Sequence, residues 1–277
     1  MRLLITGAGG QLGRDLVAAF SGHDVIACDH ATLDVGDRDA VLQAITSTAP
    51  DAVVHAGAWT AVDACESDPD RAFRVNALGT RHVADAARRA GAWVCYVSTD
   101  YVFDGALDRP YNEWDATNPQ SVYGRSKRGG ELELDGAATV VRTSWVCGPH
   151  GKNFVKTMLR LAGERETWGV VNDQHGCPTF TADLAETIRQ LVVARLPGTF
   201  HVSNQGPTTW FGFAQAILGA AGLDPGRITP ITSAEYPVPA PRPANSVLDN
   251  AALRLTGLPL LPDWHDSLAR TVKELSP

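Results

Sequence analysis

The sequence predicts an α/β fold in which a doubly wound parallel sheet is followed by a smaller C-terminal subdomain. Short apolar runs alternate with helical patterns through the first half of the chain, as expected when crossover helices join parallel strands. A glycine-rich turn links the first apolar run to the first helical segment. After about residue 150, helical segments are separated by longer irregular stretches, which predicts a second packing unit there.

Five apolar runs are candidates for the strands of the sheet. Each is short and rich in valine, isoleucine or other apolar residues, which is typical of strands buried on both faces. Helices must therefore cover both faces of this sheet. The runs cover residues 3–6, 24–28, 52–55, 93–98 and 139–142.

Three helical segments lie between these runs. Residues 12–20 place leucine and phenylalanine at helical spacing. Asp37 is a candidate N-cap for a helix that runs through Ile45. The alanine-rich segment 70–90 predicts one helix that stops at Gly91.

The change of pattern defines the expected domains. We expect residues 1–150 to form the sheet domain, with a helix and a strand near 179–202 returning to it, and residues 151–277 to form mainly the second subdomain. Four prolines between Pro237 and Pro243 make a stiff segment that cannot donate ladder hydrogen bonds, so it should line a surface or a cleft and position Arg242 there. Helices of the second half are expected at 154–162, 181–193, 210–221 and 265–275.

Composition excludes several classes of protein. With 44% apolar residues and a net charge of −7, the 277-residue chain is globular rather than disordered. The acidic balance, with a pI of about 5.6, argues against nucleic acid as a partner. No stretch approaches the ~20 apolar residues of a membrane helix, and the first residues do not form a signal peptide. We therefore expect a cytoplasmic protein. The five cysteines are odd in number and contain no C-x-x-C pair, so no disulfides are expected. We expect the chain to be a monomer or a homodimer.

Glycines at positions 7, 10 and 13 open the first helix directly after the first strand. Gly7 allows a tight turn, Gly10 removes the Cβ that would keep the backbone from a pyrophosphate, and Gly13 lets the helix pack closely. A tight turn alone would also explain these glycines. Their position at the first strand–helix junction favours a dinucleotide cofactor and a Rossmann-type sheet.

Asp29 ends the second strand, 22 residues after Gly7. A carboxylate there can accept hydrogen bonds from a ribose 2′-OH and would repel a 2′-phosphate, which favours NAD over NADP. Arg2 and Arg38 are the candidates for reaching a 2′-phosphate, and Asp29 as a plain strand end is the alternative interpretation.

Two further segments are candidate cofactor contacts. Asp34 and Val35, in the loop after the second strand, are candidates for the adenine edge. Ala56, Gly57 and Ala58 end the third strand with side chains small enough for the middle of a cofactor to pass, although a crowded sheet end would also favour them.

Tyr123 and Lys127 stand four residues apart in a predicted helix and therefore share one face of it. A nearby ammonium stabilises a phenolate, so Lys127 should lower the pKa of Tyr123 toward the working pH, where a phenol can give or take a proton at a carbonyl oxygen. Thr99 follows the fourth strand, at the edge where open α/β sheets bind ligands, and its hydroxyl can hold the same oxygen. Such a pair alone is common on solvated helix faces, but the glycine turn and Thr99 favour a catalytic site.

The sequence resembles the extended short-chain dehydrogenase/reductase family and, within it, the dTDP-4-dehydrorhamnose reductases. The matching motifs run in order along nearly the whole chain. They are Thr60 to Asp63, Val75-Asn76, Ser98 to Gly105, Tyr123 to Lys127, Arg142 to Val146, Asn153 to Val155, Asp173-Gln174, Gly176, Pro178-Thr179, Arg242-Pro243, Ser246 and Leu248.

The resemblance implies reduction of the 4-keto group of a dTDP-linked 4-keto-6-deoxyhexose, dTDP-4-dehydrorhamnose, to give dTDP-L-rhamnose. Hydride would come from NADPH or NADH and the proton from Tyr123, with Lys127 as its pKa-lowering, ribose-binding partner and Thr99 steadying the 4-oxo group. Substrate contacts are implied for Thr99, Asp100, Trp145 and Arg242, the last at the diphosphate, with the C-terminal subdomain as the substrate-binding part. Cofactor contacts are expected at Gly7, Gly10, Gln11, Leu12, Gly13, Asp29, Asp34, Val35, Ala56, Gly57, Ala58, Tyr123 and Lys127.

Three other functions share parts of this pattern. A sugar-nucleotide dehydratase would use the same Tyr/Lys pair, but that family has Glu where Tyr101 stands, and elimination of water needs an acid and a base. A non-catalytic regulatory subunit of the same fold is disfavoured by the intact Thr99, Tyr123 and Lys127. A reductase for another dTDP-4-keto-6-deoxysugar is the nearest alternative.

No metal is expected. Zinc-type ligands occur at Cys147, His150, His175 and Cys177, but their spacing is unlike that of known zinc sites. The resemblance offers only Asp15 and Asp183 as counterparts of the acidic residues linked to magnesium in some family members, which are too few.

The chain also departs from the family pattern. The segment His55 to Trp59 replaces the usual N-A-A-A-Y, which makes His55 a candidate for altering the packing around the cofactor.

Overall fold

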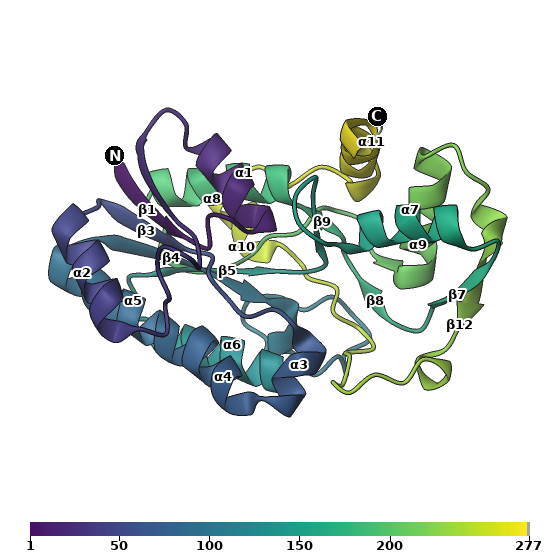
Figure 1. Cartoon of the computed structure of the whole chain (residues 1–277), viewed down its shortest axis with the longest axis horizontal. Helices are drawn as coiled ribbons and strands as arrows, with labels where there is room; N and C mark the ends of the chain where they lie inside the picture. Colours follow the sequence, from purple (N-terminus) through teal and green to yellow (C-terminus); the bar gives the residue numbers. More distant parts are fainter. Residues whose placement is uncertain (276–277) are drawn as a thin grey trace.

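A six-stranded parallel sheet forms the centre of the protein, for which a computed structural model describes residues 1–275 (Figure 1). The strand order is β10-β5-β4-β3-β1-β2, so β1 lies next to the edge strand β2 and the later strands are added in turn on its other side. The predicted doubly wound α/β fold is therefore confirmed, and its topological switch point lies between β1 and β3. The strands are β1 (Arg2–Thr6), β2 (Asp24–Cys28), β3 (Ala52–His55), β4 (Trp93–Thr99), β5 (Thr139–Thr143) and β10 (Gly198–His201).

Burial on both faces explains why these segments are strands. In β1, Leu3 and Ile5 belong to one apolar core, while Leu4 between them belongs to another on the opposite face. Such a strand needs apolar residues at every position, which is the pattern that predicted the first five strands to within one residue.

Helices cover both faces of the sheet (Figure 1). On one side α1 (Gln11–Ala19) packs against α8 (Thr181–Val193), so α8 and β10 complete the sheet domain from the second half of the chain. On the other side lie α2, α5 and α6. The remaining helices of the sheet domain are α2 (Arg38–Thr48), α3 (Val62–Ser67), α4 (Pro69–Phe73), α5 (Gly79–Ala90), α6 (Val122–Leu132) and α10 (Ala251–Thr256).

Local signals set some helix ends and tertiary contacts override others. Asp37 caps α2 as predicted, accepting hydrogen bonds from the backbone N–H groups of Asp39 and Ala40. The helical span predicted for 70–90 and its end at Gly91 are confirmed, but the helix is not regular throughout, because a π-helical segment (Arg74–Leu78) lies between α4 and α5. The carbonyl of Asn76 within it accepts hydrogen bonds from side chains, which explains the interruption of regular helical bonding.

A second apolar core lies beyond the sheet and is formed by the C-terminal elements. Three helices surround it, with Phe213, Ile217 and Trp264 among its buried side chains. The helices are α7 (Phe154–Glu164), α9 (Trp210–Ala220) and α11 (Trp264–Leu275), and the short strands are β6 (Val146–Cys147), β7 (Trp168–Val171), β8 (His175–Gly176), β9 (Thr179–Phe180), β11 (Thr208–Thr209) and β12 (Ile228–Ile231). Single 3₁₀ turns occur at Asp100–Val102, Pro225–Arg227 and Ser233–Glu235.

Helix length and polarity bear on membrane insertion. Within residues 1–275, every helix is too short or too polar to span a bilayer.

Candidate active site

The glycine turn leaves the first amides of α1 open. Gly7 has a φ of 70°, in the left-handed region that a tight turn requires, and its carbonyl accepts the N–H of Gly10 at 3.0 Å. Gly10 is the N-cap of α1, and no side chain among residues 1–275 caps this helix. Uncapped amides at a helix start form an anion site, so the turn fits the pyrophosphate of a dinucleotide.

Close approach of the backbone explains Gly13. A Cβ at this position would lie 2.1 Å from the carbonyl oxygen of Gly7 and 2.7 Å from the Cα of Ala8. No side chain fits there, so α1 can start next to the turn only with glycine at this position.

The ends of β2 and β3 lie against the same turn. A Cβ on Gly7 would lie 2.8 Å from the Cα of Gly57, and the Gly57 N–H donates to Thr6 Oγ1 at 3.1 Å. Gly9 approaches Asp29, whose Cβ would lie 3.2 Å from a Cβ on the glycine. The structure thus brings the glycine turn, Asp29 and the segment 56–58 together at the carboxyl edge of the sheet.

Asp29 is a half-buried carboxylate held by its own loop. Its Oδ1 accepts the N–H groups of Ala31 and Thr32, both at 3.0 Å, and the hydroxyl of Thr32. These bonds, those from Thr32 first, hold the pKa of Asp29 below its ordinary value. A carboxylate that is ionised at neutral pH suits a ribose 2′-OH at this place and opposes a 2′-phosphate.

Of the two arginines considered for a 2′-phosphate, Arg2 lies elsewhere. Arg2 begins β1, at the opposite edge of the sheet, and pairs with Asp24 at 2.7 Å, so that expectation is wrong. Arg38 starts α2 and pairs with Asp39 at 3.3 Å.

Four of the expected cofactor contacts differ in which of their groups a ligand could reach. The side chains of Leu12 and Val35 are buried in the cores, so they leave only backbone groups for a ligand. Asp34 is half-buried and accepts the N–H of Gly36. Gln11 accepts a hydrogen bond from Asn153 at 2.9 Å, which ties the start of α1 to the loop before α7.

Helix α6 carries Tyr123 and Lys127, as the sequence predicts. Ser121 caps it by accepting the N–H of Gly124 at 3.0 Å, and the Glu66 carboxylate of α3 accepts the N–H of Val122 at 2.7 Å. These two bonds fix the first turn, in which Tyr123 lies.

Tyr123 and Thr99 are buried together. Burial raises the pKa of Tyr123 above its ordinary value, and a hydrogen bond with the Thr99 side chain opposes that rise. The net shift is therefore opposite to the lowering expected from Lys127. A phenol in this state is fully protonated at neutral pH.

The side chain of Lys127 is buried between α6 and the strand β4. Its ammonium donates to the carbonyl of Val97 at 2.7 Å and lies 4.1 Å from the centre of the Tyr96 ring. Burial lowers the pKa of Lys127 to about 7, and the carboxylate of Glu131 opposes this effect. Lys127 therefore changes charge near neutral pH.

Asp100 completes the buried cluster. It accepts the hydroxyl of Thr99 at 2.9 Å, and burial raises its pKa to about 6. Thr99, Asp100 and Tyr123 thus form one polar group at the end of β4.

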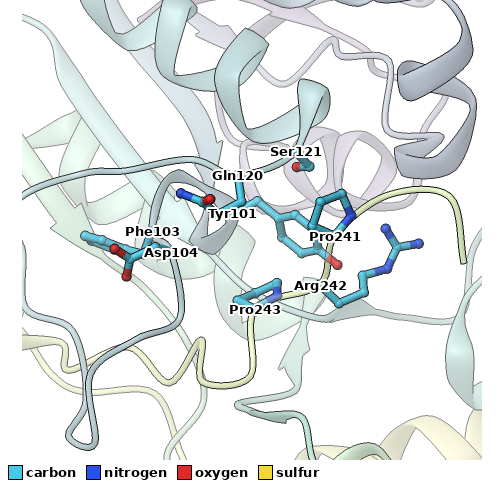
Figure 2. Close-up of a pocket in the computed structure, with 8 residues that line it drawn as sticks. All are labelled: Tyr101, Phe103, Asp104, Gln120, Ser121, Pro241, Arg242 and Pro243. Atoms are coloured by element: carbon cyan, nitrogen blue, oxygen red, sulfur yellow. The ribbon is translucent and has the colours of Figure 1, made fainter. Parts of the chain in front are cut away.

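Tyr101 lies between Arg242 and this group. The Tyr101 ring meets Tyr123 edge-on with centroids 5.6 Å apart, and the guanidinium carbon of Arg242 is 6.0 Å from the centre of the Tyr101 ring. Figure 2 shows the pocket at this place, with Tyr101 beside Pro241, Arg242 and Pro243. Sequence reasoning missed the partner of Arg242, which is Asp63 at 2.9 Å. The T-A-V-D motif that ends at Asp63 was the one feature of the sequence that could have pointed to this residue.

Trp145 lies at the junction between the sheet and the second core. It follows β5 with a φ of 46°, and its ring stacks on Trp210 of α9 with centroids 3.6 Å apart. Its indole also covers Gly176, where a Cβ would lie 2.4 Å from the ring.

A family model described as the RmlD substrate binding domain matches residues 1–276. The chain belongs to this family. The dTDP-4-dehydrorhamnose reductase of Streptomyces griseus is 44% identical, covering 99% of this chain and 94% of its own length. A relative in Streptomyces antibioticus, named as a probable dTDP-4,6-dihydroxy-2-methyloxan-3-one 4-ketoreductase, is 43% identical and covers 99% of this chain and 96% of its own. Among solved structures, the dTDP-4-dehydrorhamnose reductase of Bacillus anthracis in complex with NADP superposes with a TM-score of 0.95 at 40% identity, covering 99% of each chain.

His55 joins two threonines in the sheet interior. Its Nδ1 lies 2.7 Å from Thr6 Oγ1 and its Nε2 lies 3.3 Å from Thr80 Oγ1. The Thr80 hydroxyl donates to the carbonyl of Asn76, so it accepts from Nε2–H, and Nδ1 accepts from Thr6. Because Thr6 also accepts the N–H of Gly57, a neutral His55 helps to hold the rim around the glycine turn.

The candidate metal ligands do not gather into one site. Among the described residues there is no cluster of three or more metal-binding side chains. Asp183 instead pairs with Arg270 at 2.6 Å, and Asp15 lies 3.7 Å from His150.

Gly13→Ala tests the close approach at the glycine turn. The added methyl group meets backbone atoms that cannot move freely, so we expect a loss of about 1–3 kcal/mol in the free energy of unfolding. Gly22→Ala is the matched control, because a Cβ there meets nothing within 4 Å. Urea denaturation of both variants measures this, and equal stability of Gly13→Ala and the parent would show that the turn has room.

His55→Asn tests the buried histidine through the pH dependence of stability. Burial lowers the pKa of His55 to about 3, from an ordinary value near 6.5. The unfolded chain therefore binds a proton that the folded chain does not, and stability falls as the pH falls from about 6.5, by up to about 1.4 kcal/mol per pH unit. We expect this slope to decrease in His55→Asn and to persist in a control variant of the exposed His30. Identical slopes in the parent and His55→Asn would contradict the assignment of this pH dependence to His55.

Proposed function

We propose that the protein reduces the 4-keto group of dTDP-4-dehydrorhamnose to give dTDP-L-rhamnose, with NADPH or NADH as the hydride source. The observation that carries this proposal is the meeting of the Tyr123 and Thr99 hydroxyls with Lys127 on the same helix, at the sheet edge where the glycine turn leaves amides open. The 44% identity to a reductase of this name over nearly the full chain supports it.

The residues present fit a nicotinamide dinucleotide. The open amides of the glycine turn would hold its pyrophosphate, Asp29 its adenosine ribose, and the segment 56–58 would line its middle. When bound, it supplies the hydride that reaches C4 of the sugar. The NADP in the B. anthracis relative supports NADPH, whereas the ionised Asp29 supports NADH, and we propose that the site accepts both.

The side chains of this chain handle the oxygen and the proton. The hydroxyls of Thr99 and Tyr123 hydrogen-bond the 4-oxo group and orient it. Negative charge then develops on that oxygen, and Tyr123 donates its proton, because an alkoxide is far more basic than even a buried phenol. The Lys127 ammonium stabilises the phenolate that is left.

The substrate would lie between the sheet edge and the C-terminal part of the chain. We propose that residues 151–277 mainly bind the nucleotide sugar, with Trp145 and Asp100 contacting it and Arg242 facing its diphosphate. An arginine suits this task because its planar donor groups match phosphate oxygens.

The second candidate is the reduction of another dTDP-linked 4-keto-6-deoxysugar. The relative from S. antibioticus, named for a different ketosugar, is nearly as similar as the S. griseus reductase. Comparing kcat/KM for the two ketosugars with the purified enzyme decides between them.

Tyr123→Phe tests the proton donor. Loss of general acid catalysis should lower kcat for NADPH oxidation with dTDP-4-dehydrorhamnose by about 10²–10⁴-fold, since the oxygen would have to take its proton from water. Tyr236→Phe is the control, because Tyr236 is 61% exposed, and its rate should match the parent. A parent enzyme without ketosugar-dependent oxidation, or a fully active Tyr123→Phe, contradicts the proposed function.

Lys127 gives the reaction a predicted pH dependence. Its pKa of about 7 means that the ammonium is present below this pH and is lost as the pH rises through it. We therefore expect kcat/KM for reduction to fall as the pH rises through about 7. Lys127→Arg keeps its charge, so its activity should be lower but without this fall. If the fall is unchanged in Lys127→Arg, another group titrates and the role of Lys127 is wrong.

A further inference from the structure

The proline segment, residues 237–243, is held at one point by Asp63 of α3. The Oδ1 atom of Asp63 accepts the backbone N–H of Ala240 at 3.2 Å, and its Oδ2 pairs with the guanidinium of Arg242 at 2.9 Å. One carboxylate therefore fixes both the path of the segment and the direction of its arginine.

Gly105 holds the other end of the same segment. It has a φ of 79°, and a Cβ there would lie 2.7 Å from the Cβ of Pro243 and 2.8 Å from the N of Ala244. Any larger residue would push the proline segment away. Pro241 and Pro243 flank Arg242 and restrict φ between the two points, so little freedom is left around the arginine.

Arg242 is largely buried in this arrangement but has donors to spare. Its side chain is 19% exposed, and it bonds only to Asp63 and, at 3.4 Å, to the carbonyl of Ala240 among the described residues. These bonds use some of its N–H groups and leave others for a ligand. Figure 2 places it next to Tyr101, which in turn contacts Tyr123.

Helix α3 also fixes the helix that carries Tyr123. Glu66, three residues after Asp63, accepts the N–H of Val122 at the start of α6 at 2.7 Å. The same short helix thus sets the position of the proline segment and that of α6.

We propose that Asp63 is a positioning residue that holds Arg242 in the direction needed to bind the diphosphate of the sugar nucleotide. This inference rests on the proposed function, because it assumes a dTDP-linked substrate. An arginine that is ordered before binding loses less conformational entropy when the diphosphate binds, and this benefit exceeds the repulsion from a half-exposed carboxylate.

Asp63→Asn tests the proposal with little change in shape. The amide oxygen can still accept the N–H of Ala240, but the amide nitrogen cannot accept from Arg242. We expect the Kd for dTDP, measured by calorimetry, to rise about 3- to 10-fold. The KM for the ketosugar should rise similarly at unchanged kcat, and the Kd for NADPH should match the parent, which also reports a folded protein. Asp70→Asn, which removes one exposed charge from neighbouring α4, should change none of these values.

A double-mutant cycle with Arg242→Gln separates positioning from general effects. Arg242→Gln should weaken dTDP binding strongly in the parent and less in the Asp63→Asn background, since the arginine is already misdirected there. Unchanged or tighter dTDP binding by Asp63→Asn overturns the proposal, as does an equal effect of Arg242→Gln in both backgrounds. A parent that does not bind dTDP at all would instead contradict the proposed function, and this inference with it.

Discussion

The close packing of α6 on β4 is the constraint on which the site depends. A Cβ at Gly124 would lie 2.2 Å from the carbonyl oxygen of Tyr101, so the helix touches the chain directly after Thr99. Lys127 reaches the carbonyl of Val97 within the strand. Further along α6, Glu131 forms a two-point ion pair with Arg142 of β5 and accepts the hydroxyl of Ser98. Together these contacts fix the rotation of α6, and Tyr123 meets Thr99 as a result.

Burial gives this cluster its acid–base properties. It keeps Tyr123 protonated, brings the pKa of Lys127 down to about 7 and that of Asp100 up to about 6, and holds His55 neutral. Each shift has the same cause, because a low-dielectric interior disfavours the charged form of every group. A buried site in which a proton donor and a cation lie on one helix is suited to the reduction of a carbonyl, where charge develops on one oxygen.

The sequence predicted the features that depend on local pattern. Strands buried on both faces need continuous apolar runs, Asp37 caps α2 through its own neighbours, and the spacing of Tyr123 and Lys127 is a property of one helix. The features that it could not predict depend on distant residues. Asp63 and Arg242 are 179 positions apart.

The π-helical segment shows the same limit. It forms where Asn76 bonds to Trp59 and Ser126, and neither partner is visible in the helical pattern of residues 70–90. The expectation for Arg2 was wrong for another reason. A residue that begins a parallel strand lies at the edge of the sheet opposite to the one where ligands bind.

The central claim is that the Tyr123 and Thr99 hydroxyls together hold the oxygen that is reduced. A crystal structure with NADP and dTDP-L-rhamnose bound measures this directly. The account predicts that the C4 hydroxyl oxygen of the sugar lies within hydrogen-bonding distance, about 2.6–3.2 Å, of both Tyr123 Oη and Thr99 Oγ1. A sugar whose C4 oxygen bonds to neither hydroxyl would contradict it.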